Sequence, residues 1–219
     1  MLLINSLGGL GIFLYGLKLM SETLQKVSSS KLQSFFDKFT RNKLLGIGLG
    51  AVVTSILQSS SATTIILVGF ANAGIIKLTQ SISIIFGANI GTTITAQIIA
   101  FKSSALALPL IGLSAILWLV SKKAKTRHIS DLLLGLGLLF LGLDIMGSYL
   151  KTLKDMPVFS QLFVQFGTNP LLGIAIGAFV TVLLQSSSAT TGMIIALASM
   201  GALNFQSAFA LELGGNIGT

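Results

Sequence analysis

A polar string of seven residues, Gln-Ser-Ser-Ser-Ala-Thr-Thr, occurs twice in this chain, at positions 58–64 and 185–191. Both copies lie inside apolar sequence, where burying a run of small polar residues is costly unless each group finds a partner. A costly string at equivalent places in two halves of a chain favours a shared polar function. We expect the two copies to face each other at mid-membrane and to form one polar site.

The composition indicates an integral membrane protein. The 219 residues are 53% hydrophobic and only 9% charged, with a mean hydropathy of +0.91, whereas soluble domains carry about 25% charged residues. The net charge of +8 comes from basic residues that collect in connecting segments. This distribution is typical of the topology signals of membrane proteins, so nucleic acid is not an expected partner. Cysteine is absent, and the single histidine, His128, lies in an expected basic loop. Neither a thiolate or histidine metal site nor a catalytic triad is therefore expected, and we predict no enzymatic activity and no organic cofactor.

Apolar runs predict helices along the whole chain. Residues 2–20 form a first apolar helix, and residues 21–41 form an amphipathic interfacial segment. A long segment at 80–100 is expected to be interrupted at 87–93, because Gly and Asn cluster there. The remaining expected elements are plain spans at 104–120 and 131–150, a linker at 151–168, and apolar runs at 169–184 and from the second string to about Leu203.

The apolar runs around the first string, at 43–57 and 65–76, are short. A membrane-spanning helix needs about 20 apolar residues. Two half-length helices around a polar turn predict a re-entrant hairpin, because non-helical backbone at membrane depth is tolerated only where protein or a wet cavity covers it. The alternative is one bent span through the string.

The strings belong to a longer internal repeat. Residues 42–64 and 169–191 align without a gap at an offset of 127, with 17 of 23 positions identical. The same offset places Asn89-Ile90-Gly91-Thr92 on Asn216-Ile217-Gly218-Thr219. Duplicated halves in an all-helical membrane protein indicate a transporter whose site lies between the halves. We predict an all-α integral membrane fold of two inverted-topology repeats, at 1–125 and 126–219, each with a re-entrant helical hairpin and broken helices.

The charge distribution predicts the orientation. Three crossings per half make the second half enter the membrane in the opposite sense. The basic loop at 121–130 is expected on the cytoplasmic side of the plasma membrane, by the excess of Lys and Arg in cytoplasmic loops. Counting back through the crossings then places the N-terminus outside.

The ends of half-helices explain what such strings can bind. A helix that ends near Leu57 leaves carbonyl groups without partners, and a helix that begins near Ser61 or Ala62 leaves N–H groups without partners. Carbonyls and hydroxyls suit a dehydrated Na⁺, and N–H groups at a positive dipole end suit an oxyanion. The alternative is that the serines only cap helices and hold the hairpins together. The site candidates in the strings are Gln58, Ser59, Ser60, Ser61, Gln185, Ser186, Ser187 and Ser188, followed by Thr63, Thr64, Thr190 and Thr191.

Two acidic residues lie within predicted membrane segments. Glu212 precedes Asn216 by four residues and aligns with Ile85 in the first half, so it has no counterpart there. Asp144 lies in the span 131–150. Acidic groups at membrane depth are candidates for function. We assign Glu212 a possible role in cation binding or coupling, and give Asp144 less weight.

The paired QSSSATT strings, followed by GANIGTT and GGNIGT, resemble the type II sodium–phosphate cotransporter family in its bacterial branch. The resemblance covers both repeats. It implies secondary transport of inorganic phosphate coupled to Na⁺, with phosphate held at Gln58–Ser61 and Gln185–Ser188. We assign the Na⁺ ligands to the adjoining threonines and to the two Asn-Ile-Gly-Thr stretches: Thr63, Thr64, Asn89, Thr92, Thr93, Thr190, Thr191, Asn216 and Thr219.

Three expectations remain open beside this assignment. The second half ends at Thr219, before a counterpart of the span 104–120, so we expect a completing C-terminal segment or a homo-oligomer. The substrate alternatives are sulfate or a carboxylate on the same scaffold. The alternatives of another class are a membrane module that transports nothing by itself and a channel.

Overall fold

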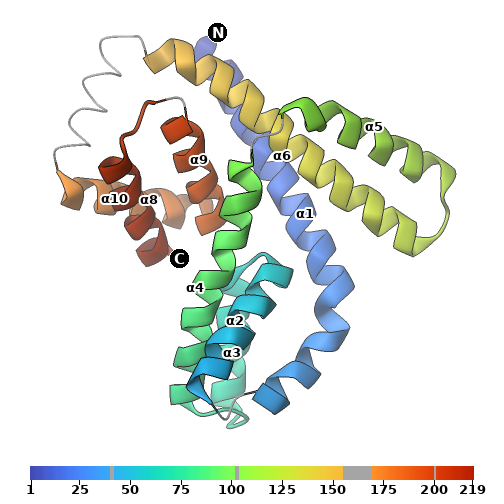
Figure 1. Ribbon diagram of the computed structural model, residues 1–219, viewed down its shortest axis with the longest axis vertical. Coiled ribbons are helices and arrows are strands. Elements are labelled where there is room, and N and C mark those ends of the chain that lie inside the picture. The colour runs from blue at the N-terminus through green and yellow to red at the C-terminus, as the bar shows by residue number, and fades with distance from the viewer. Residues whose placement is uncertain (40–41, 102–103, 155–168, 200) are drawn as a thin grey trace. The chain divides into compact units, whose positions relative to one another are not determined.

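The computed structural model describes residues 1–39, 42–101, 104–154, 169–199 and 201–219, and these ranges contain helices and no strands (Figure 1). The all-α class is therefore confirmed for the described residues. The predicted linker at 151–168 lies mostly outside them. The helices are α1 Leu2–Phe39, α2 Lys43–Leu57, α3 Ser60–Asn72, α4 Leu78–Ala100, α5 Ser104–Val120, α6 Ala124–Lys154, α8 Pro170–Leu184, α9 Ser187–Ser199 and α10 Phe205–Gly218.

Two of the described helices are long and apolar enough to cross a membrane, Leu78–Ala100 and the segment Ala124–Tyr149 of α6. Five shorter apolar helices accompany them, including α2, α3, α8 and α9 on either side of the two strings. The 15 residues of α2 extend about 22 Å at 1.5 Å per residue, which is less than the roughly 30 Å of a bilayer core. The predicted half-length of the helices around each string is thus observed.

Two expected segment boundaries differ from the structure. The first helix continues without a break from Leu2 to Phe39, through the predicted boundary at residue 20. The prediction of a basic loop at 121–130 is wrong in extent, because α6 already begins at Ala124 and contains His128. The Lys123 carbonyl accepts from the N–H groups of Thr126 and Arg127, and Lys and Arg are good helix formers.

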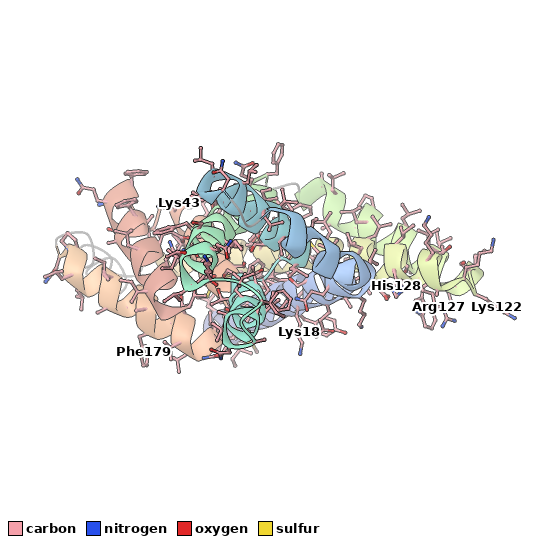
Figure 2. The ribbon with its side chains drawn as sticks, turned by 90° about the horizontal axis from the view of Figure 1, so that it is seen from below. Lys18, Lys43, Lys122, Arg127, His128 and Phe179 are labelled. Carbon is pink, nitrogen blue, oxygen red and sulfur yellow. The ribbon has the colours of Figure 1, made fainter. Side chains whose placement is uncertain are left out.

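A cation–π contact lies where α5 and α6 meet. The Arg127 guanidinium lies 5.8 Å from the centre of the Trp118 ring. Figure 2 labels Arg127 beside Lys122 and His128 at this end of the pair. The Trp118 ring therefore links the two helices around the turn.

The predicted break at 87–93 is wrong, since α4 is continuous from Leu78 to Ala100. The glycines of this stretch instead allow α4 to pack closely against α2. A Cβ on Gly87 would overlap the Ile47 carbonyl oxygen of α2, and one on Gly91 would lie 2.5 Å from the Ala51 carbonyl oxygen. Asn216 likewise lies inside the continuous helix α10. Gly spaced by four residues lets two helix backbones approach closely, which the sequence pattern alone does not distinguish from a break.

The chain forms two compact units, one of residues 21–98 and the other of residues 1–20 and 99–219. The core of the first unit contains Leu49, Val53, Leu57, Leu67, Ile76 and Ile84. These units are defined by compactness, so the repeat boundary at 125/126 stays a prediction.

The packing of α2 on α4 in one unit recurs as α8 on α10 in the other. Gly218 approaches the Ala178 carbonyl as Gly91 approaches that of Ala51, and these pairs differ by the repeat offset of 127. The repetition extends along the seam. The equivalent close approaches are Gly50 to Ile84 and Gly177 to Leu211, and Gly87 to Ile47 and Gly214 to Ile174.

Within the unit of residues 1–20 and 99–219, α1 and α6 pack antiparallel through glycines. A Cβ on Gly9 would lie 2.6 Å from the Met146 nitrogen, and one on Gly135 would lie 2.8 Å from the Met20 nitrogen. Gly9 and Gly135, like Met20 and Met146, are equivalent at an offset of 126. Each helix therefore contributes the same repeat positions to the contact, as the two partners do at an isologous two-fold interface.

Candidate functional site

Each polar string forms the turn between two short helices, and both turns have the same backbone conformation. Gln58 ends α2 with φ 55° and ψ 27°, and Gln185 ends α8 with φ 53° and ψ 28°. They are the only non-glycine residues with positive φ in the described part of the chain. A left-handed conformation costs an L-residue roughly 1–2 kcal/mol. Glycine usually takes such a helix-terminating position, so the use of Gln at both turns indicates that its side chain has a task.

The first serine of each string caps the following helix. Ser59 Oγ accepts from the Ala62 N–H at 3.1 Å, and Ser186 Oγ accepts from the Ala189 N–H at 3.2 Å. The helices α3 and α9 begin one residue later, at Ser60 and Ser187. The predicted end of the first short helix at Leu57 is confirmed, and the second begins at Ser60, one or two residues before the predicted start. The first serine hydroxyls stabilise the turns, as in the capping alternative.

The second and third serines of each string behave differently. The hydroxyls of Ser60, Ser61, Ser187 and Ser188 form no hydrogen bond with any residue that the structure describes. They lie in the first turns of α3 and α9, where N–H groups lack carbonyl partners within their own helix. Hydroxyls and N–H groups at the positive end of a helix can together bind an oxyanion by donating hydrogen bonds to it. These four serines are the best-placed phosphate candidates among the predicted set.

A pair of buried threonines closes each turn. The Oγ1 atoms of Thr54 and Thr63 are 2.9 Å apart, and those of Thr181 and Thr190 are 2.8 Å apart. Sequence reasoning singled out Thr63 and Thr190 but missed their partners. The available signal was that Thr54 and Thr181 are an identical pair within the aligned repeat. Each pair joins the two short helices next to the serines.

The glutamine side chains differ between the turns. Both amides fold back onto their own helix, Gln58 Nε2 donating to the Ser55 carbonyl and Gln185 Nε2 to the Val182 carbonyl at 2.6 Å. Gln58 is also buried and accepts from Thr95 Oγ1 of α4 at 2.6 Å. Gln185 is exposed.

Gln25 of α1 is a second group near the first turn that sequence reasoning missed. Its Nε2 donates to the Leu57 carbonyl at 3.2 Å, satisfying one of the carbonyl groups at the end of α2. No sequence pattern pointed to this residue, because its partner lies 32 positions away.

The second turn carries a carboxylate that the first turn lacks. Thr191 Oγ1 lies 2.8 Å from Glu212 Oε1 and 3.0 Å from Oε2, within reach as a donor to either oxygen. The equivalent positions in the first repeat are Thr64 and Ile85. The structure thus brings together two predicted residues, and the two turns are chemically unequal. Asp144, in contrast, is exposed on α6.

The remaining Na⁺ candidates lie on continuous helices. Asn89 and Asn216 are exposed. The threonine hydroxyls donate to carbonyls of their own helix, namely Thr92 to Ala88 at 3.2 Å, Thr93 to Ile90 at 2.7 Å and Thr219 to Gly215 at 2.9 Å. A hydroxyl that donates one hydrogen bond keeps lone pairs for a cation, so these assignments stay predictions. That the two turns face each other also stays a prediction.

Comparison with known proteins gives similar proteins in bacteria and mammals. The chain is 26% identical over 217 residues to the putative inorganic phosphate export protein YjbB of Escherichia coli O157:H7, covering 99% of this chain and 40% of that protein. It is 27% identical over 207 residues to the uncharacterized protein YqeW of Bacillus subtilis, covering 94% of this chain and 67% of YqeW. It is 39% identical over 100 residues to the human sodium-dependent phosphate transport protein 2B, covering 45% of this chain and 14% of that protein. No solved structure gives a significant match.

The sequence also matches a protein family over nearly its full length. The match covers residues 12–148 and 150–219, and the description of the family is Na⁺/Pi-cotransporter. Both polar strings, with the turns described above, fall inside the matched ranges. The resemblance inferred from the strings is thereby confirmed: the chain belongs to the Na⁺/Pi-cotransporter family.

Proposed function

We propose that this chain is the core of a secondary transporter that couples Na⁺ to the movement of inorganic phosphate across the plasma membrane. The observation that carries the proposal is the repeated turn: two strings with the same left-handed Gln, the same serine cap and the same threonine pair. Each turn presents two serine hydroxyls without a described partner at a helix N-terminus. The chain spans 40% of the length of the phosphate export protein, so transport by the whole protein is part of the proposal.

The packing of α1 on α6 supports inverted-topology repeats. Equivalent helices of two repeats run antiparallel and exchange equivalent contacts, which requires the two repeats to point in opposite directions along these helices. Inverted repeats place equivalent hairpins on opposite sides of a central site, and rocking of one repeat against the other then alternates access. Short helices around each string support re-entrant hairpins. In this topology the N-terminus lies outside and the turn at 121–123 is cytoplasmic.

The lack of a lysine or arginine in either string favours weak, reversible phosphate binding through neutral donors. Release must follow binding in a transporter, so N–H groups and hydroxyls suit the task better than buried ion pairs. The driving force would come from Na⁺, since each positive charge that moves through 100 mV gains about 2.3 kcal/mol.

We assign the cation of the second repeat to Glu212 and Thr191. A carboxylate within hydrogen-bond distance of a buried threonine hydroxyl offers oxygen ligands and one negative charge, both of which favour Na⁺ binding. Because Ile85 occupies the equivalent position in the first repeat, this ligand set is confined to one half. Because the two halves then differ in their Na⁺ ligands, binding of a single Na⁺ would favour one of the two orientations of the transporter.

The first test is Na⁺-dependent uptake of labelled phosphate into liposomes that contain the 219-residue chain. Ser60→Ala with Ser187→Ala is expected to abolish uptake. The matched control is Ser148→Ala with Ser199→Ala, because those exposed serines donate only within their own helices. Uptake that persists in the first double variant, or is equally lost in the control, would contradict the site assignment. Unlabelled sulfate and succinate in parallel arms distinguish phosphate from the alternative anions.

The second test distinguishes a role of Glu212 in Na⁺ binding from a role in phosphate binding. Glu212→Gln keeps the shape and removes the charge, so the Na⁺ concentration for half-maximal uptake should rise by about tenfold or more. The phosphate concentration for half-maximal uptake at saturating Na⁺ should change little. Equal changes in both constants would refute a cation-specific role for Glu212.

A further inference from the structure

A polar cavity of about 240 Å³ lies within the compact unit of residues 21–98, away from the string. The first residues of α2 and α4 form its walls, and each contributes a lysine, Lys43 from α2 and Lys77 immediately before α4. Both lysine side chains are exposed, and Lys43 is labelled in Figure 2. Every side chain that the structure describes along the cavity is neutral or basic.

The two helices contact each other at the cavity. A Cβ on Gly46 would lie 3.2 Å from the Cβ of the buried Ser83, and both residues line the cavity. Because Gly46 has no side chain, the two helices can approach each other here. The cavity therefore lies at the N-terminal end of the glycine seam that joins α2 to α4.

The helix ends at the cavity add positive potential to the lysines. Asn42 Oδ1 accepts from the Leu44 N–H at 3.0 Å, and Gln80 Oε1 accepts from the Lys77 N–H at 2.7 Å. These caps use one N–H group each. The N–H groups of Gly46 and Gln80 donate to the carbonyls of Asn42 and Lys77. The positive ends of both helix dipoles meet at the cavity. The two ammonium groups, the two helix N-termini and the side chains of Asn42, Thr79 and Gln80 line one volume. The Ser83 hydroxyl donates to the Thr79 carbonyl at 3.3 Å.

The second repeat shows that the fold does not need this charge. At the offset of 127, Lys43 corresponds to Pro170, Lys77 to Asn204 and Ser83 to Ala210. The equivalent helices α8 and α10 nevertheless pack in the same way, with Gly173 approaching Ala210. The two lysines and the serine are therefore present in only one of the two copies of the scaffold, and they make that copy the more basic one at this position.

We propose that the cavity binds a phosphate group, as free inorganic phosphate or as the headgroup of an anionic lipid. A volume of about 240 Å³ holds a tetrahedral oxyanion with some of its water, and the donors around it match oxygens in several directions. The site is distinct from the serine turns. It does not depend on the proposed transport function.

The experiment measures the acetylation rate of individual lysines by mass spectrometry in the 219-residue chain in vesicles, with a membrane-permeant reagent. One arm adds inorganic phosphate to phosphatidylcholine vesicles at constant ionic strength, and the other replaces part of the lipid with phosphatidylglycerol. At a probe concentration about ten times the dissociation constant, acetylation of Lys43 and Lys77 should slow about tenfold, because only the unoccupied fraction reacts. The exposed Lys122 and Lys123 are internal controls.

Protection in the phosphate arm assigns the site to the free anion, and protection only with phosphatidylglycerol assigns it to a headgroup. Two variants test the geometry. Lys43→Gln should weaken binding about tenfold, so that acetylation of Lys77 slows only about twofold at the same probe concentration. Lys122→Gln should have no effect. Protection of Lys43 and Lys77 no greater than that of Lys122 and Lys123 in both arms would overturn the proposal, as would unchanged protection of Lys77 in Lys43→Gln.

Discussion

The glycine seam between α1 and α6 gives a quantitative prediction. A Cβ on Gly16 would lie 2.5 Å from the Leu139 nitrogen, 2.6 Å from the Gly135 oxygen and 2.9 Å from the Leu138 carbon. All three neighbours are backbone atoms, which cannot rotate away as a side chain can. Gly11, on the same helix, has nothing within 4 Å of the equivalent position. The pair Gly16→Ala and Gly11→Ala therefore adds the same methyl group in a closed and in an open place.

The magnitude follows from these distances. Ordinary contact begins at 3.4 Å, so Gly16→Ala must push the two backbones apart by almost 1 Å. Overpacking of this kind costs about 1–3 kcal/mol in cores that can adjust, and separation of the seam also loses dispersion contacts along it. Both variants gain the same helix propensity of roughly 1 kcal/mol from Gly to Ala. The difference between the variants thus isolates the cost at the seam, which we expect to be about 2 kcal/mol or more.

The assay is thermal unfolding of each purified variant in the same detergent, followed by far-ultraviolet circular dichroism. A difference of about 2 kcal/mol corresponds to a midpoint about 4–8 °C lower for Gly16→Ala than for Gly11→Ala in a chain of this size. Equal midpoints would show that α1 and α6 do not approach through this glycine. The support that this seam gives to inverted repeats would then be lost.

Three further variants test the turns and the glycine-rich stretches. Gly91→Ala should lower the unfolding midpoint by several degrees, because its Cβ would lie 2.5 Å from the Ala51 oxygen; a higher midpoint would instead restore the interpretation of this stretch as a helix break. Gln185→Gly should raise the midpoint by relieving about 1 kcal/mol of left-handed strain while reducing phosphate uptake, and uptake at the wild-type level would show that the glutamine side chain is not needed. Thr190→Val should cost about 1–3 kcal/mol, because the buried Thr181 hydroxyl loses its partner at 2.8 Å; Thr190→Ser should retain most of the stability, and equal losses in both variants would point to the methyl group instead.

The sequence by itself determined the class of the protein and, within one or two residues, where its short helices meet the polar strings. Apolar runs interrupted by a seven-residue polar string leave few alternatives to two helices and a turn, and the structure ends α2 at Leu57 and begins α3 at Ser60. The repeat then transfers the same boundaries to Leu184 and Ser187. These features are local, since they depend on which residues can be buried and which can cap a helix.

Only the tertiary structure decided what the glycines and several polar residues do. The sequence around Gly87 and Gly91 predicts a helix break, yet both glycines lie in a continuous helix that packs against α2. The sequence alone cannot distinguish the two cases, because glycine can either break a helix or allow a neighbouring helix to approach closely. The partners of Thr191 and Gln58 lie 21 and 37 positions away. No local pattern encodes such distances, because the packing of one helix on another selects which hydroxyls meet a carboxylate, an amide or each other.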